Sequence, residues 1–214
     1  TVLYFLPPAI SIVHGILAQT FFILIIILAY SFSKERNQRI EVVEVYSPLL
    51  KKRALIVGGL VYLQLILGAL MRHNSAGLAI PDFPTMGGYW LPPFNESMLS
   101  AINARLFDMD REMVSMAQVV VHFFHRLGGL VVTGSILHFG YKLFSMNNVL
   151  PFIKVTMGLI LGVVIVQFSL GAITILTERA PLIASFHVVT GAALLGLCTL
   201  MVLRVFPLNL KNNS

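Results

Sequence analysis

The sequence predicts an all-α protein, a polytopic membrane helical bundle, and two observations lead to that fold class. Of its 214 residues, 57% are hydrophobic and only 11% are charged, whereas a soluble domain carries about 25% charged residues. The apolar residues also gather in five runs, each near the ~20 residues that a helix needs to cross a bilayer. These predicted spans cover residues 8–32, 54–71, 114–143, 151–176 and 181–206.

The charges between the spans predict how the chain is oriented. The connection 34–53 carries six basic residues against three glutamates, while the connection 72–113 carries five acidic residues against three basic ones. Because basic residues favour the cytoplasmic side of a membrane, we expect 34–53 and the tail 207–214 in the cytoplasm and 72–113 outside it. The basic residues thus orient helices in a lipid bilayer, and the net charge of +6 does not indicate a nucleic-acid partner.

The connection 72–113 is too long to be a simple link. Its first part, 74–93, is dense in glycine and proline, which favours turns. Apolar residues then recur at helical spacing and predict a short amphipathic helix on the membrane surface, with Met98, Leu99, Ile102, Leu106 and Met109 on its apolar face. Two interpretations stay open for the whole connection: a solvated connector, or a lid over the outer end of the bundle with Tyr89 and Trp90 at the interface.

Three of the five spans carry histidines near the predicted outer face. His14 and His187 each follow a span-opening proline by six residues, which is about 9 Å along a helix. His122 and His125 lie at comparable depth in the third span. A lone membrane histidine more often bonds two helices together, but ionisable groups gathered at one depth predict a functional site. His138 lies near the opposite end of its span, and we expect it at the interface.

Two imidazoles that face each other across a bundle are a suitable axial pair for a haem iron. His187 supplies one, and either His122 or His125 supplies the other; depth alone slightly favours His122, and the residues leave that choice open. Arg126 is expected to meet a haem propionate, unless it is a snorkelling cation or a partner for the acidic residues of the loop. Small residues that would leave room for a porphyrin are Gly128, Gly129 and Gly191.

A non-haem metal held by His122 and His125 is disfavoured, because the spans contain no carboxylates to complete such a site. The single cysteine, Cys198, excludes an internal disulfide, a thiolate metal cage and a covalent haem attachment through paired cysteines.

The chain also repeats itself. The stretch 8–14 parallels 181–187 with proline and histidine in register, and the Gln-x-x-x-Gly-Ala sequence at 64–69 recurs at 167–172. These matches predict a duplicated four-helix unit, of which the chain holds one complete copy and the last helix of an earlier copy. We therefore expect a piece of a longer protein. Its predicted parts are the last helix of an N-terminal half (1–33), a cytoplasmic linker (34–53), a C-terminal haem-binding half (54–206, with its outer loop 72–113) and the tail (207–214).

The stretch 68–84, Gly-Ala-Leu-Met-Arg-His-Asn-Ser-Ala-Gly-Leu-Ala-Ile-Pro-Asp-Phe-Pro, resembles the first-loop signature of haem A synthases. His125 and Arg126 resemble the His-Arg pair of that family, and His14 and His187 resemble the histidines that lie on the last helix of each four-helix half. The resemblance covers essentially the whole chain and aligns it with helices four to eight of an eight-helix protein. The loop has Ile80 and no cysteine, so the chain is similar to the cysteine-less subclass, and no thiol redox step is assigned to this half.

The resemblance implies a function. Haem A synthase oxidises the C8 methyl group of haem O to a formyl group, by successive hydroxylations, for terminal oxidases. Its C-terminal half would hold a haem b between His125 and His187, and His14 would be one ligand of the substrate haem O in the other half. The catalytic carboxylate would belong to the N-terminal half, so this chain alone should be catalytically incomplete.

The same resemblance implies partners and a location. The partners would be haem O synthase and a quinone or another electron acceptor. The location would be a bacterial plasma membrane or the mitochondrial inner membrane, with the C-terminus on the cytoplasmic or matrix side. Three other functions fit the same helices: a membrane b-type cytochrome that only transfers electrons, a haem or small-molecule transporter, and a structural assembly factor.

Overall fold

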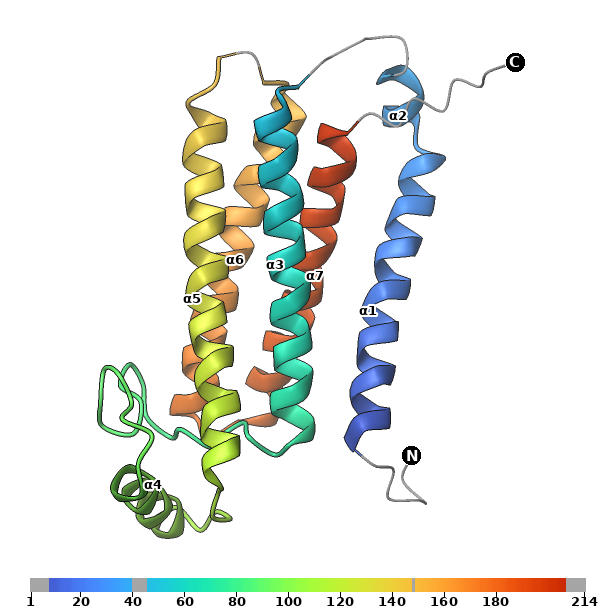
Figure 1. Ribbon diagram of the computed structural model, residues 1–214. Coiled ribbons are helices and arrows are strands. Elements are labelled where there is room, and N and C mark those ends of the chain that lie inside the picture. The colour runs from blue at the N-terminus through green and yellow to red at the C-terminus, as the bar shows by residue number, and fades with distance from the viewer. Residues whose placement is uncertain (1–7, 40–45, 148, 207–214) are drawn as a thin grey trace.

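A computed structural model describes residues 8–39, 46–147 and 149–206. These residues form seven helices and no β-strand (Figure 1). The helices are α1 (Pro8–Ser31), α2 (Lys34–Arg39), α3 (Pro48–His73), α4 (Glu96–Asp108), α5 (Met116–Phe144), α6 (Pro151–Leu176) and α7 (Pro181–Val205).

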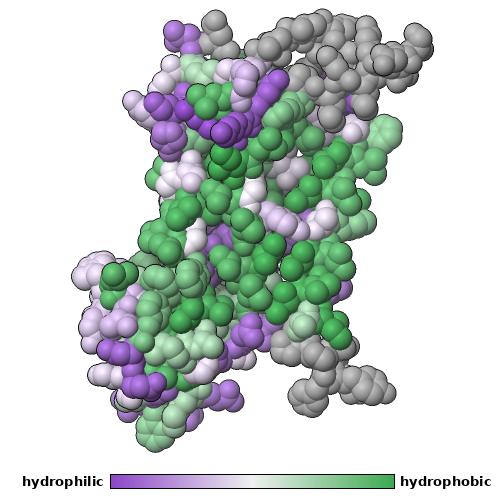
Figure 2. All heavy atoms as spheres, viewed as in Figure 1, coloured by the Kyte–Doolittle hydropathy of each residue, from purple (hydrophilic) through white to green (hydrophobic). Residues whose placement is uncertain are grey.

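Five of these helices, α1, α3, α5, α6 and α7, are long and apolar enough to cross a membrane. They match the five predicted spans and confirm the predicted fold class. Figure 2 shows the consequence at the surface, where a broad apolar belt separates two polar ends. A belt of this kind is what a polytopic helical protein presents to lipid.

The second span begins earlier than expected. We predicted its start at Ala54, but α3 begins at Pro48, and the basic residues Lys51, Lys52 and Arg53 lie in its first two turns. Ser47 caps the helix by accepting a hydrogen bond from the amide of Leu50, and proline is favoured in a first turn because its nitrogen has no hydrogen to leave unpaired. A basic first turn is compatible with a membrane helix because the long side chains reach the interface.

Helices α3, α5, α6 and α7 pack as a four-helix bundle. Helix α5 packs against α3 and α6, and α7 packs against the same two helices, so α5 and α7 occupy opposite corners (Figure 1). Helix α1 lies outside this bundle against α3 and α7, and a 2.7 Å hydrogen bond between Thr20 and Tyr62 links it to α3. Helices α1, α5 and α7 all begin at one end, which also carries the connection between α3 and α5 and is called the loop end below.

At the opposite end, an ion pair ties α2 to α7. The guanidinium of Arg204 contacts both carboxylate oxygens of Glu35, at 2.8 and 2.5 Å. The same guanidinium also donates to the hydroxyl of Thr156 and to the carbonyl oxygen of Phe152 on α6. These contacts join α2, α6 and α7 at this end of the bundle.

The predicted helix in the loop is confirmed as α4, which ends at Asp108, before Met109 of the predicted apolar face; its apolar face packs against the loop, and its place on a membrane surface stays a prediction. Asn95 caps it by accepting a hydrogen bond from the amide of Met98. Its buried face consists of Met98, Ile102 and Leu106. Those side chains pack in one cluster with the loop residues 76–80 and with Val119 of α5. The first half of the connection, residues 74–93, therefore packs on the loop end and is called the cap below. It is not the solvated connector that was one of the two interpretations.

Candidate haem site and its loop

The cap is built around the carboxylate of Asp82. This side chain is 7% exposed and accepts three hydrogen bonds, from the hydroxyl of Thr85 (2.6 Å) and from the amides of Gly87 (2.7 Å) and Gly88 (2.9 Å). Both glycines have positive φ, at 65° and 83°, a conformation that other residues adopt with strain. Burial raises the pKa of Asp82, but these hydrogen bonds together with the charge of Arg126 outweigh it, so the pKa lies below its usual value.

Arg126 of α5 holds this loop to the bundle. Its guanidinium donates to the carbonyl oxygens of Ile80 (3.1 Å), Asp82 (2.6 Å) and Thr85 (3.0 Å). Its Nε donates to Nε2 of His122, one turn earlier on the same helix. Of the roles considered from the sequence, a partner for the loop is the one observed, although the contacts are to carbonyls and not to side-chain carboxylates.

His122 also contacts the loop. Its side chain is buried, and its Nδ1 lies 3.1 Å from the amide nitrogen of Ile80. Arg126 contacts Nε2, so both ring nitrogens face hydrogen-bond donors. A neutral imidazole has only one nitrogen that can accept a hydrogen bond. Neither nitrogen is presented to the bundle interior. Both ring nitrogens of His122 thus have hydrogen-bond partners, and His125 stays the predicted ligand.

The imidazole of His125 lies in a socket formed by α3. The amide nitrogen of Gln64 is 3.1 Å from Nδ1 of the ring and donates to the carbonyl oxygen of His125 at 2.8 Å. Gly68, one turn further along α3, leaves space for the ring, because a Cβ there would lie 3.3 Å from Cε1 of the imidazole. Gly128 likewise leaves space for the glutamine, because its Cβ would lie 2.2 Å from Oε1 of Gln64.

The imidazole of His187 lies in a second socket, formed by α6. Its Nδ1 is 3.2 Å from the carbonyl oxygen of Gln167, and its Nε2 is 3.5 Å from the side-chain nitrogen of the same residue. A Cβ at Gly171 would lie 3.1 Å from Cε1 of this ring, and a Cβ at Gly191 would lie 3.1 Å from Nε2 of Gln167. The repeated Gln-x-x-x-Gly sequence noted above therefore forms two corresponding sockets, one on α3 with a side-chain amide at Nδ1 and one on α6 with a backbone carbonyl at Nδ1.

The bundle places the two candidate ligands on different helices at similar depth. His125 lies on α5 and His187 on α7, at opposite corners of the bundle, nine and six residues from the loop-end starts of their helices. His14 is not part of this arrangement: it lies on α1, outside the four-helix bundle, and is exposed.

These residues fit a haem better than a bare metal ion. Within the described part of the chain, no group of three or more histidine, cysteine or carboxylate side chains is placed to hold a metal. An axial haem pair needs only two imidazoles on opposite sides of an iron. The buried Oε1 of Gln64 has no hydrogen-bond partner among the described residues.

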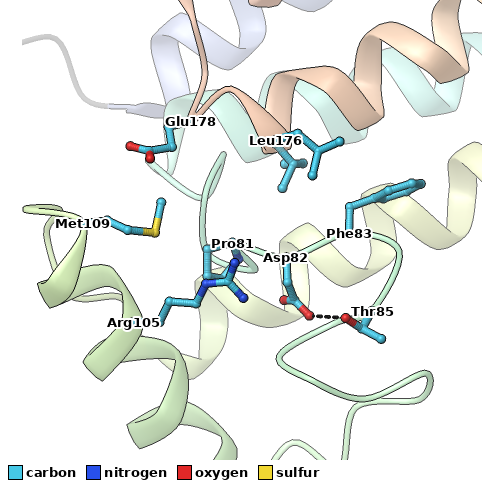
Figure 3. A pocket seen from close by; sticks show the side chains of 9 residues that line it. Pro81, Asp82, Phe83, Thr85, Arg105, Met109, Leu176 and Glu178 are labelled. Atoms are coloured by element: carbon cyan, nitrogen blue, oxygen red, sulfur yellow. Dashed lines mark hydrogen bonds between the residues drawn. The ribbon is translucent and has the colours of Figure 1, made fainter.

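A separate pocket lies at the loop end. Its volume is about 450 Å³, and its walls come from the cap, α4 and the turn between α6 and α7. Figure 3 shows Arg105 extending from α4 toward Pro81 and Asp82. Met109 and Glu178 lie on the side of the pocket away from Asp82 and Thr85. None of the candidate ligand histidines lines it. The pocket therefore borders the cap and is distinct from the histidine pair.

The contacts of Gln64 and Gln167 with the histidines were not predicted, although the repeat that contains both glutamines is visible in the sequence. The available signal was a polar side chain at the same register in two apolar spans, each followed four residues later by glycine. A buried amide in a membrane needs a partner. The histidines on the neighbouring helices were the candidates.

Comparison with known proteins identifies the family. A family model described as "Cytochrome oxidase assembly protein" (COX15-CtaA) matches residues 3–199. A "Heme A synthase" from Orientia tsutsugamushi (strain Boryong) is 28% identical over 193 residues, which is 87% of this chain and 50% of the relative. One from Rickettsia prowazekii (strain Madrid E) is 31% identical over 138 residues, 64% of this chain and 37% of the relative. "Heme A synthase COX15" of Arabidopsis thaliana is 31% identical over 158 residues, 72% of this chain and 31% of the relative.

No solved structure matches the chain. The chain spans about half the length, or less, of the curated relatives that it matches. Its five apolar helices and its match over nearly its whole length agree on an integral membrane protein. The chain belongs to the COX15-CtaA family of cytochrome oxidase assembly proteins.

Proposed function

We propose that this chain is the haem b-binding half of a haem A synthase, which oxidises the C8 methyl group of haem O to a formyl group for terminal oxidases. Support comes from the family, from relatives named as haem A synthases, and from one structural observation. That observation is the pair of imidazoles on diagonally opposed helices, each in a matched glycine-containing socket. A duplicated socket for two histidines is more than a helix-packing contact requires.

His125 and His187 are the proposed axial ligands of haem b. A haem with two imidazole ligands has no open coordination position, so it supplies electron transfer when bound. The chain holds the two rings at a fixed depth near the loop end and surrounds them with apolar helices that exclude water. Gly68 and Gly171 allow each ring to lie flat against its neighbouring helix.

Arg126 has two proposed tasks. It anchors the loop over this end of the bundle, through the carbonyl contacts described above. A guanidinium has five N–H donors, and the four contacts of Arg126 leave one hydrogen on Nη1 for a haem propionate. The cap would thereby act as a lid whose position depends on the same residue that meets the cofactor.

The remaining machinery is proposed to lie in the other half of the protein. His14 would be a ligand of the substrate haem O, and the catalytic carboxylate would come from the N-terminal half. The cap would face the extracytoplasmic side of a bacterial plasma membrane or its equivalent in the mitochondrial inner membrane, with the C-terminus on the opposite side. Haem O synthase and a quinone or another electron acceptor are the proposed partners.

Two variants of the full-length protein test the haem assignment. His187→Ala should abolish the low-spin haem b signal in the dithionite-reduced optical spectrum. His138→Ala, at an exposed histidine near the far end of α5, should retain it and serves as the matched control. A retained low-spin signal in His187→Ala would rule the ligand assignment out.

Pigment analysis of membrane extracts separates the proposed activity from its alternatives. A haem A synthase converts haem O to haem A in cells that lack their own enzyme. A b-type cytochrome that only transfers electrons would show the haem b spectrum without that conversion, and a transporter would hold no stoichiometric haem. Absence of haem A from complemented cells, with the full-length protein present in the membrane, would refute the proposed activity.

A further inference from the structure

We propose that Gln64 is a positioning residue for His125 and that it tunes the haem iron through the far side of the imidazole ring, with Gln167 as its weaker counterpart at His187. This inference rests on the proposed function, because it takes the two histidines as axial ligands. It goes further by assigning a role to two intramembrane amides. It also assigns different strengths to the two.

The contacts of Gln64 are directed at a single residue. Its amide nitrogen reaches both Nδ1 and the backbone carbonyl oxygen of His125. A polar side chain inside a bilayer is costly unless it is paired, and a glutamine that only joined two helices could bond any backbone carbonyl. Here the pairing is to the ring itself, and Gly128 is the residue that lets the amide approach.

The iron-bound state would need a hydrogen-bond acceptor on the far side of the imidazole ring. An imidazole that binds a metal through Nε2 carries its proton on Nδ1, which is then a donor and needs an acceptor. Oε1 of Gln64 is buried and has no hydrogen-bond partner among the described residues. Rotation of the terminal amide exchanges its oxygen and nitrogen. It supplies Nδ1–H with an acceptor and gives up the hydrogen bond from the amide nitrogen to the carbonyl oxygen of His125.

The second socket uses the backbone for the same purpose. Nδ1 of His187 is 3.2 Å from the carbonyl oxygen of Gln167, and a carbonyl oxygen remains when the side chain is changed. The side-chain oxygen of Gln167 accepts a hydrogen bond from the hydroxyl of Thr190, and its nitrogen is 3.5 Å from Nε2 of His187. Loss of the Gln167 side chain should therefore affect the haem less than loss of the Gln64 side chain.

The direction of the effect follows from the hydrogen bond. An acceptor at Nδ1–H makes the imidazole a stronger donor to the iron, which favours the oxidised state. Gln64→Met removes the acceptor and keeps an unbranched side chain of similar length. We expect its haem b to have a more positive midpoint potential and a shifted low-spin EPR signal. Its haem affinity should fall about 10- to 100-fold, as is usual when such a partner is lost.

The experiment compares five variants of the full-length, haem-loaded protein, together with His125→Ala, by redox titration, EPR and transfer of haem to apomyoglobin. Gln64→Met should shift all three readouts, Gln167→Met should shift them less, and Gln19→Met is the control. Gln19 is another membrane glutamine, on α1, and its amide bonds no histidine among the residues described. Gly128→Ala should reproduce the effect of Gln64→Met, because its Cβ displaces the amide oxygen. The adjacent Gly129→Ala should not, because its Cβ would lie 3.7 Å from the amide nitrogen.

The outcomes separate the inference from the function on which it rests. A parent protein without a low-spin haem, or one that keeps it in His125→Ala, would refute the axial assignment and the inference together. A haem that depends on His125, with a potential and affinity unchanged in both Gln64→Met and Gly128→Ala, would refute the inference alone. Two independent variants keep the test decisive if one of them fails to fold.

Discussion

Replacement of Arg126 by methionine should release the cap from the bundle. The substitution keeps an apolar stem but removes every guanidinium contact to the loop carbonyls. A hydrogen bond to a charged group contributes about 1.5–3 kcal/mol. Two of the acceptors, the carbonyls of Ile80 and Asp82, belong to residues that are 0% and 7% exposed. At the lower value, these two bonds alone hold the cap closed by about 3 kcal/mol.

That magnitude predicts a measurable rate. Because about 1.4 kcal/mol corresponds to a factor of ten in an equilibrium constant, amide hydrogen exchange in residues 76–89 of Arg126→Met should be faster by about 100-fold. Mass spectrometry of the detergent-solubilised protein measures this peptide by peptide.

Arg111→Met is the matched control for this prediction. Arg111 pairs with Glu178 at 3.1 Å, with side chains that are 47% and 44% exposed, and surface pairs contribute about 0–1 kcal/mol. Its loop exchange should therefore rise by no more than about fivefold. Exchange in Arg126→Met that stays within this smaller range would refute the view that Arg126 anchors the cap.

Two further predictions concern the two ends of the bundle. The ionised form of Asp82 stabilises the cap, because the pKa of this carboxyl in the folded protein lies below its usual value. This stabilisation is present above about pH 4 and is lost as the pH falls through the lowered pKa. Protection factors of the Gly87 and Gly88 amides should therefore decrease below about pH 4. Asp82→Asn should lack this protection at neutral pH as well. Constant protection from pH 3 to 7 in the parent protein would contradict the role of the ionised Asp82 in the cap. At the other end, Arg204→Met should lower the melting temperature more than Arg111→Met, because Arg204 is only 16% exposed and its removal leaves the partly buried carboxylate of Glu35 without its cation. Equal melting temperatures for these two variants would count against that ranking.

The long helices were predictable because each is an uninterrupted apolar run with a proline or a polar residue at its start. The boundary of α3 was not predicted correctly, because Lys51, Lys52 and Arg53 suggested a connection outside the membrane. A better signal was present in Ser47 and Pro48, which are a favourable cap and first residue for a helix. The physical reason for the error is that long basic side chains tolerate a helical position near the interface.

The histidine site was predictable only in part. Depth along the helix placed His122, His125 and His187 at one level, but His122 and His125 differ by only about 60° around the helix axis. Which of them faces the interior depends on how α5 is rotated, and that rotation is fixed by contacts distant in sequence. In the structure the amide of Ile80 and the side chain of Arg126 engage His122, which leaves His125 for the interior.

The same limit applies to the glutamines. Their repeat was visible in the sequence, but a repeat does not show which side chain lies opposite. Only the packing of α3 against α5 and of α6 against α7 pairs Gln64 with His125 and Gln167 with His187.

The central claim is that one iron is bound between His125 and His187. Its most direct test is an experimental map of the full-length protein purified with its haem, by electron cryomicroscopy or crystallography. We expect porphyrin density inside the α3–α5–α6–α7 bundle near the loop end, with its iron bonded to Nε2 of both histidines. An iron bonded to His122, or a porphyrin bound outside this four-helix bundle, would contradict the account.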